Sequence, residues 1–232
     1  MDEARYERIG AATGLAAVVL FVLGFLVTPT APGVDADAQE VFTYFVEDQD
    51  PIRLGVLLLA LGIGALVWFL GTLRTALANA ELGSERLASI AFGAGVVSIA
   101  ALTFELGTLA TAAFRPEQTT PELTRAIWDL GTMVAGVASV AFMVFFAAVA
   151  VATLRTAALP RQLGWLAAAT AVANALGVGR LFTDSGLFAA DGLLGSIAGF
   201  VLFLAWTAAA SATLMGRFSA PRPERHPAEH AS

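Results

Sequence analysis

A single acidic residue lies inside an apolar part of the sequence, where a free charge is costly. Glu105 directly follows the uncharged run 87–104, about two turns before that helix is expected to end. On a helical wheel of about 100° per residue, small residues surround Glu105 and bulky residues lie opposite. The small set is Ala91, Ala94, Ser98, Ala101 and Ala112, and the bulky set is Phe92, Val96, Ile99 and Phe114. Because helix interfaces in membranes favour small residues, we expect Glu105 to face the interior of a helix bundle.

Other charged residues lie near the outer ends of the expected helices and could act together with Glu105. They are Arg53, Asp129, Arg180, Asp184 and Asp191. Asp129 follows Arg125 by four residues, a spacing that allows an ion pair wherever the stretch is helical. Asp184 follows Arg180 at the same spacing.

Three interpretations of Glu105 stay open at this point. In the first, its carboxylate pairs with Arg180 or Arg53 and holds neighbouring helices together, since buried charges generally need a partner. In the second, Glu105 exchanges a proton or binds a cation in a polar cavity open to the outside, near Asp129 and Asp184. In the third, Glu105 is protonated and passive. Asp129, Asp184 and Asp191, taken one by one, are more typical of interfacial residues than of ligands.

The composition excludes several kinds of chemistry. The chain has no cysteine, which removes disulfides, thiol catalysis and thiolate metal sites. Its thirteen basic residues are all arginine, so no lysine is available for a retinal Schiff base. His226 and His230 lie in a Pro-rich tail, so Ser185 in Asp184-Ser185-Gly186 has no membrane-embedded base. We expect a non-enzymatic protein with no cofactor, no metal site and no nucleic-acid partner.

Six long apolar stretches are the elements that would position these residues. They cover 9–28, 54–73, 87–104, 130–154, 163–179 and 192–216, in a chain that is 57% hydrophobic with a mean hydropathy of +0.75. Each is about as long as a bilayer-crossing helix, and no other structure satisfies the backbone amides economically without water. We expect an all-α polytopic membrane protein with one domain at 1–219 and a disordered tail at 220–232. Its helices are predicted near 9–28, 52–77, 87–113, 123–156, 163–182 and 192–216.

A shorter amphipathic helix is predicted near 37–48, in the outer segment between the first two spans. Asp37 and Glu40 have the spacing of a capping box. The apolar residues that then recur at helical intervals are Ala38, Val41, Phe42 and Phe45. Asp50-Pro51 and Thr120-Pro121 predict two further helix starts. The short helix would lie on the outer membrane face or act as a lid over a site between the spans.

The arginines predict the orientation of the chain. Arg5, Arg8, Arg74, Arg86, Arg155, Arg161, Arg217, Arg222 and Arg225 fall on one side of the expected spans, and Arg53, Arg115, Arg125 and Arg180 fall on the other. Under the positive-inside rule both termini are then cytoplasmic. Arginine as the sole basic residue, with abundant Ala and Gly, is typical of a high-GC bacterial genome. We therefore expect a location in the inner cell membrane.

Two sequence patterns bear on how the helices are related. Residues 72–76 and 153–157 both read Thr-Leu-Arg-Thr-Ala, and each ends an expected helix. This predicts three parallel two-helix repeats, although a chance similarity of composition stays an equal alternative. Glycine pairs such as Gly10/Gly14 and Gly195/Gly199 favour close helix packing, within one chain or in an oligomer.

The chain also resembles known proteins at a coarse level. The residues that carry this are the Arg-flanked start Met1–Arg8, the acidic Phe-rich segment 35–50 and the helix exit Trp68–Arg74. With six spans, the chain resembles uncharacterised six-helix integral membrane families of high-GC bacteria. The resemblance covers most of the chain and implies neither a catalytic residue nor a substrate.

Together these observations favour a scaffold, a subunit or a lipid-interacting protein. The alternative is a proton- or cation-coupled transporter of small solutes that uses Glu105 and the outer charges. The expected partners are the lipid bilayer and either further copies of the chain or another membrane protein.

Overall fold

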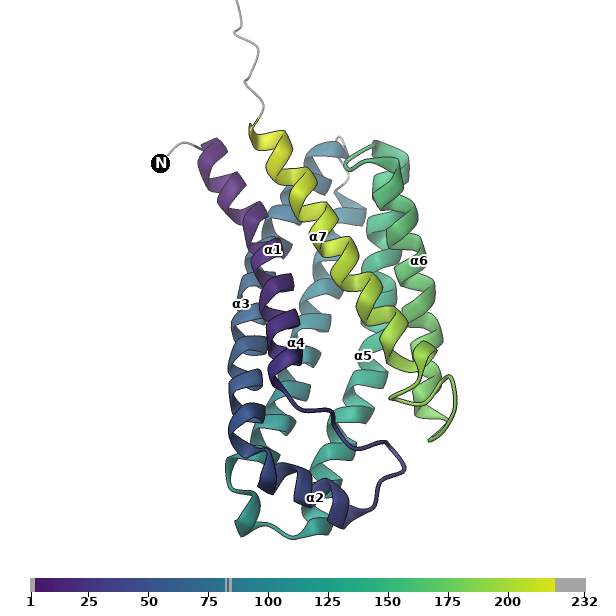
Figure 1. The fold of residues 1–232 in the computed structure, drawn as a ribbon. Helices are drawn as coiled ribbons and strands as arrows, with labels where there is room; N and C mark the ends of the chain where they lie inside the picture. The colour runs from purple at the N-terminus through teal and green to yellow at the C-terminus, as the bar shows by residue number, and fades with distance from the viewer. Residues whose placement is uncertain (1–2, 82, 84, 220–232) are drawn as a thin grey trace, which may run out of the picture.

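The structure, a computed structural model, describes residues 3–81, 83 and 85–219, and these form an all-α fold (Figure 1). The described residues contain seven α-helices: α1 Glu3–Val27, α2 Ala38–Glu47, α3 Gln49–Ala80, α4 Arg86–Phe114, α5 Pro121–Thr156, α6 Arg161–Gly177 and α7 Ala198–Ser219. Short turns of tighter or wider helix are η1 Pro116–Gln118, η2 Val178–Leu181 and η3 Leu193–Ile197. The tail predicted to be disordered, with His226 and His230, lies outside the described residues. The predicted all-α class is confirmed.

Among the described residues, five helices are long and apolar enough to cross a membrane. They are α1, α3, α4, α5 and the continuous stretch formed by η3 and α7. The sixth expected span is shorter, since α6 has 17 residues and ends at Gly177, where η2 continues the chain to Leu181.

Helix starts follow the capping chemistry at two of the three expected places. The Asp37 carboxylate accepts a hydrogen bond from the Glu40 N–H at 2.8 Å and begins α2. The Thr120 hydroxyl accepts from the Leu123 N–H at 3.3 Å, and Pro121 is the first residue of α5. The predicted cap at Asp50 is wrong, because Asp48 alone separates α2 from α3, which already begins at Gln49.

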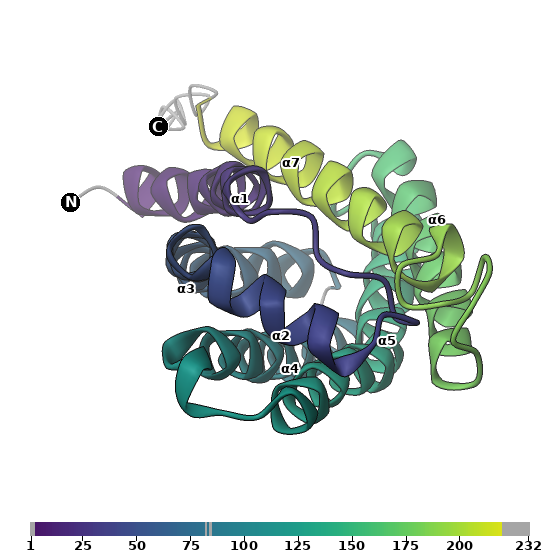
Figure 2. The same ribbon diagram turned by 60° about the horizontal axis from the view of Figure 1, so that its bottom comes forward.

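The six longer helices form a closed ring in chain order. Each of α1, α3, α4, α5, α6 and α7 packs against the next, and α7 returns to pack against α1. Viewed along the bundle, α2 lies across one end of this ring (Figure 2). We call this the α2 end, marked by Val27, Gln49 and Phe114. The opposite, terminal end holds Glu3 and Ser219, the two ends of the described chain (Figure 1).

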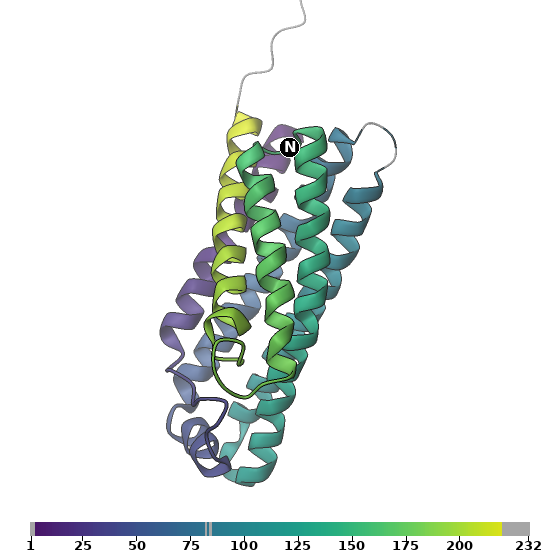
Figure 3. The ribbon, with the colours of Figure 1, turned by 90° about the vertical axis from the view of Figure 1, so that its right-hand side faces the viewer.

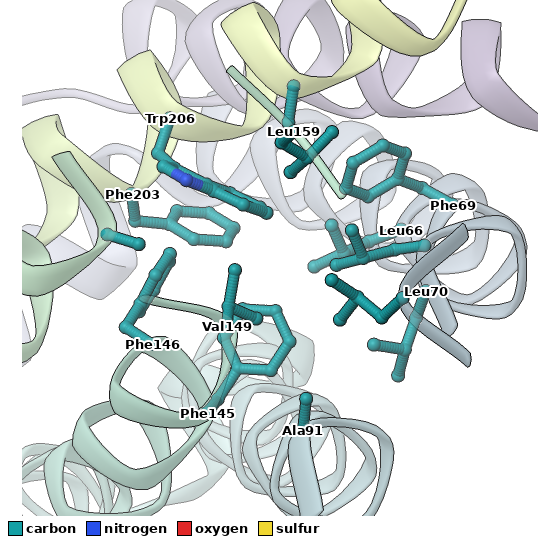
Figure 4. Close-up of a cluster of buried hydrophobic side chains, with 14 of the residues drawn as sticks. Leu66, Phe69, Leu70, Ala91, Phe145, Phe146, Val149, Leu159, Phe203 and Trp206 are labelled. Atoms are coloured by element: carbon teal, nitrogen blue, oxygen red, sulfur yellow. The ribbon is translucent and has the colours of Figure 1, made fainter. Parts of the chain in front are cut away.

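Aromatic side chains fill the centre of the ring around Trp206 of α7. Its ring centroid lies 6.5 Å from Phe69 of α3, 6.2 Å from Phe145 and 5.4 Å from Phe146 of α5. The Trp206 indole N–H donates to the Leu163 carbonyl of α6 at 3.0 Å. Figure 4 shows these side chains gathered with Leu66 and Leu70. Trp206 therefore joins four helices in a solvent-free core.

A serine hydroxyl joins the two helices that close the ring. Ser211 of α7 donates to the Ala11 carbonyl of α1 and accepts from the Leu15 N–H at 3.1 Å. In a regular helix the Leu15 N–H would donate to the Ala11 carbonyl, and the Ser211 hydroxyl lies between these two groups. A side chain inserted in this way is a known cause of helix bending. In Figure 1, α1 changes direction part-way along its length.

Glycines bring α1 close to α3, as the sequence predicts. A Cβ at Gly14 would lie 2.6 Å from the Phe69 ring, and one at Gly10 would overlap the Thr72 hydroxyl. Other glycines have no such role, since a Cβ at Gly64 would meet nothing within 4 Å. The three-repeat hypothesis stays a prediction.

We expect Trp206→Ala to cost about 3–5 kcal/mol of unfolding free energy, because it opens a cavity between four helices. The matched control is Trp165→Ala on α6, where the side chain is 59% exposed. Thermal unfolding of both variants in one detergent measures the difference. Similar losses in the two variants would contradict the central role of Trp206.

Candidate functional site

Glu105 continues the inward-facing stripe of α4. Ala91, Gly95 and Ser98 are buried on this stripe, and Ala112 is buried beyond Glu105. The Glu105 side chain itself is partly buried. The predicted orientation toward the bundle therefore holds. For one residue of the opposite set the prediction is wrong. Ile99 was expected to face away from the bundle, but it is 9% exposed and packs in the core.

Arg180 is the cation that acts on Glu105. It lies in η2 directly after α6, and the two charges interact electrostatically. No salt bridge within 4.0 Å joins them among the described residues. The guanidinium instead donates twice to the Gly195 carbonyl, from Nε at 2.9 Å and from a terminal nitrogen.

A glycine on α5 lets Arg180 approach the bundle. An added Cβ at Gly136 would lie 3.0 Å from Arg180 Cγ, closer than most real contacts. Arg180 therefore joins three parts of the fold: α5 through its packed stem, η3 through Gly195 and α4 through the charge of Glu105.

Arg53 has another role than the predicted pairing with Glu105. Its Nε donates to the Ala113 carbonyl at 3.1 Å and a terminal nitrogen donates to the Phe114 carbonyl. These are the last carbonyls of α4, which lack partners within the helix. A cation at a helix C-terminus also stabilises the helix dipole. Arg53 is thus a cap of α4, with a loose contact of 3.8 Å to Asp50.

Asp129 belongs to a second local arrangement. Its carboxylate accepts from Arg125 Nε at 2.9 Å, as the four-residue spacing predicts. The two terminal nitrogens of Arg125 donate to the Val34 carbonyl at 2.7 Å and to the Ala36 carbonyl. Asp129 therefore orients an arginine that fixes the segment leading into α2.

Asp184 and Asp191 lie in the exposed segment between η2 and η3. Asp184 forms no salt bridge within 4.0 Å with Arg180 in the described structure, because the residues after Leu181 are not helical. Of the five predicted site residues, only Glu105 and Arg180 are brought together. Arg53, Asp129 and Asp184 lie elsewhere at the α2 end.

The apolar face of α2 packs against the ends of the long helices. Val41, Tyr44 and Phe45 are buried with Ile52 of α3 and Ala112 and Ala113 of α4. Leu109, one turn from Glu105, packs against the same cluster. The Tyr44 hydroxyl donates to the Pro29 carbonyl at 3.1 Å. The helix therefore covers the end of the ring above Glu105.

Glu105 lines neither of two surface grooves that the described residues form. One, of about 290 Å³, lies between α4 and α5 and is entirely apolar, with Ala101 and Met133 among its residues. The other, of about 720 Å³, lies between α1, α3 and α7 at the terminal end. Among the described residues, no group of three or more His, Cys, Asp or Glu side chains could hold a metal ion.

Comparisons with protein families, curated proteins and solved structures found no match for this chain. The resemblance to six-helix bacterial families stays a prediction. The five long apolar helices nevertheless identify the chain as a polytopic membrane protein. Exposed Val97, Val137 and Val172 on the outer helix surfaces would face lipid.

We predict that Tyr44 weakens the fold at alkaline pH. Burial, with a smaller effect of Asp48, raises the pKa of Tyr44 from 10.0 to about 12. Between these values the unfolded chain releases the phenol proton while the folded chain keeps it, so stability falls as pH rises. Tyr44→Phe should abolish this part of the decline in thermal stability.

The phenol proton can be followed directly, since Tyr6 and Tyr44 are the chain's only tyrosines. In a Tyr6→Phe background, the phenolate absorbance should reach its midpoint near pH 12. A midpoint near pH 10 would contradict the burial of this hydroxyl against Pro29.

Proposed function

We propose that the protein is a non-enzymatic six-span bundle of the inner cell membrane that acts as a scaffold, a subunit or a lipid-interacting protein. The aromatic packing around Trp206 carries this proposal, because it fills the ring with side chains from α3, α5 and α7. A filled centre favours a structural role over a central pore. The absence of Lys and Cys from the sequence supports a non-enzymatic role, since few bases or nucleophiles are available.

In this proposal α6 is the sixth span. Its 17 residues extend for about 25 Å at about 1.5 Å per residue. The four residues of η2 add about 8 Å in a tighter helix. The sum is close to the roughly 30 Å of a hydrocarbon core. The position of α6 alongside α5 and α7 supports the same assignment (Figure 3).

Both termini are cytoplasmic in this proposal. Seven arginines of the described chain lie at the terminal end, namely Arg5, Arg8, Arg74, Arg86, Arg155, Arg161 and Arg217. Four lie at the α2 end, namely Arg53, Arg115, Arg125 and Arg180. Arg222 and Arg225 lie outside the described residues. The positive-inside rule then places the terminal end in the cytoplasm.

The Glu105–Arg180 pair serves this bundle as an electrostatic tie. Arg180 is fixed to the Gly195 carbonyl, so its charge is held at the junction of α6 and α7. Glu105 supplies the opposite charge from α4, and Gly136 of α5 leaves room for the stem of Arg180. The pair therefore joins segments that are distant in sequence.

A second function is favoured by one specific observation. The Glu105 carboxylate has neither a salt bridge within 4.0 Å nor a side-chain hydrogen bond to any described residue. A carboxylate inside a span without a direct partner is typical of ion and proton pathways. The alternative is therefore a proton- or cation-coupled transporter of small solutes built on Glu105.

We expect Glu105→Leu to destabilise the protein by on the order of 2 kcal/mol, because Arg180 stays partly desolvated and loses the opposite charge of Glu105. The double variant with Arg180→Leu should lose less than the sum of the two single variants. Glu117→Leu, at an exposed position of η1, should stay within about 0.5 kcal/mol of the unchanged protein. Thermal unfolding in one detergent measures all four.

A neutral or stabilising effect of Glu105→Leu would contradict the structural role and favour transport. The deciding measurement is then decay of a pH gradient across proteoliposomes, with and without added small solutes. Under the transport alternative, Glu105→Gln abolishes the decay, whereas Glu117→Gln retains it.

A further inference from the structure

The larger groove lies at the terminal end of the bundle, away from Glu105. Its walls come from the start of α1, the end of α3 and the end of α7, and its volume is about 720 Å³. Tyr6 of α1 and Trp68 of α3 form an edge-to-face pair along it, with centroids 6.3 Å apart. Both rings are more than half exposed. An exposed tyrosine near a helix end, such as Tyr6, is typical of the boundary between hydrocarbon and headgroups.

The polarity of the groove changes along α3. Thr75 and Asn79 line it near the end of the helix, whereas Val67 and Trp68 line it about three turns deeper. The distance from Asn79 to Val67 is about 18 Å at about 1.5 Å per residue. The polar part faces the headgroup level and the apolar part faces the acyl region, which is the polarity of a lipid in the same leaflet.

Two opposite charges lie in the polar part of the groove. Arg217 of α7 is anchored by hydrogen bonds to the Ala158 and Ala157 carbonyls, so its cation is held in place. Glu7 of α1 is partly buried in the groove. No salt bridge within 4.0 Å joins Glu7 to Arg217 or to another described residue. A ligand carrying both an anion and a cation complements this pair.

We propose that this groove binds one phospholipid with an amine-bearing, zwitterionic headgroup. Its phosphate lies by Arg217, its ammonium group lies by Glu7, and one acyl chain follows Val67, Trp68 and Gly71. The site rests on the proposed function, of which it specifies the lipid interaction, and it depends on membrane insertion but not on the role of Glu105.

Gly71 provides a test that leaves the fold intact. It lines the groove, and a Cβ placed on it would meet nothing within 4 Å. The Cβ of Gly71→Leu therefore has open space, and the rest of the side chain extends into the groove. Gly64 is the matched control, because it lies two turns earlier on α3, is equally open and does not line the groove. Thermal unfolding of both variants verifies that each is folded.

The probe is phosphatidylethanolamine, added to delipidated protein in detergent and counted by native mass spectrometry. We expect one bound lipid, with affinity reduced by about tenfold or more in Gly71→Leu. Gly64→Leu should bind as the unchanged protein does. Equal affinity in the two variants would overturn the groove as the binding site.

The headgroup assignment has a separate test with phosphatidylglycerol, which lacks the amine. The unchanged protein should favour phosphatidylethanolamine, and Glu7→Gln should remove this preference while both lipids still bind. Equal affinity of the unchanged protein for the two lipids would overturn the assignment to Glu7. The lipid results do not depend on whether Glu105→Leu destabilises the protein, because Glu105 lies at the opposite end of the bundle.

Discussion

Closure of the ring by α7 is the interaction on which the other contacts depend. Trp206 enters the centre from α7, packs against Phe69 and Phe146, and donates a hydrogen bond to the start of α6. Ser211 joins the same helix to α1. Helix association in lipid relies on packing and hydrogen bonds, because lipid supplies no hydrophobic drive between helices. Because η3 continues directly into α7, the same helix also carries the Gly195 carbonyl to which Arg180 donates.

Arginines hold the connections at both ends of the bundle through backbone carbonyls. Arg53 caps α4, Arg125 holds the segment before α2, Arg180 binds Gly195, and Arg217 binds the turn between α5 and α6. A guanidinium carries five donors in a planar fork, so one side chain can bind two carbonyls or one carbonyl twice. These arginines at helix ends therefore mainly stabilise the fold. Glu105 differs from them because it lies inside a span and forms no salt bridge within 4.0 Å with a described residue.

Local patterns in the sequence predicted local structure well. The apolar runs indicated the long helices, and the capping residues Asp37 and Thr120 mark real helix starts. One error is local, the cap predicted at Asp50. Others concern distant contacts, since the binding of Arg53 to the end of α4 joins residues 60 and 61 positions apart. The burial of Ile99 depends likewise on the neighbouring helices, which a single helical wheel does not contain. Across the chain, the sequence offered Arg180 or Arg53 as a partner of Glu105 because an unpartnered charge in a membrane is costly; the structure brings only the charge of Arg180 to act on Glu105, without a salt bridge.

The central claim is that all six ring helices cross the membrane, and α6 is the helix that tests it. The chain has no cysteine, so single-cysteine variants need no altered background. Gln162→Cys marks the start of α6 and Ser185→Cys follows η2, both at exposed positions. A membrane-impermeant maleimide should label Gln162→Cys only from the cytoplasmic side and Ser185→Cys only from the outside. Labelling of both from the same side would show that α6 does not cross and would contradict the six-span account.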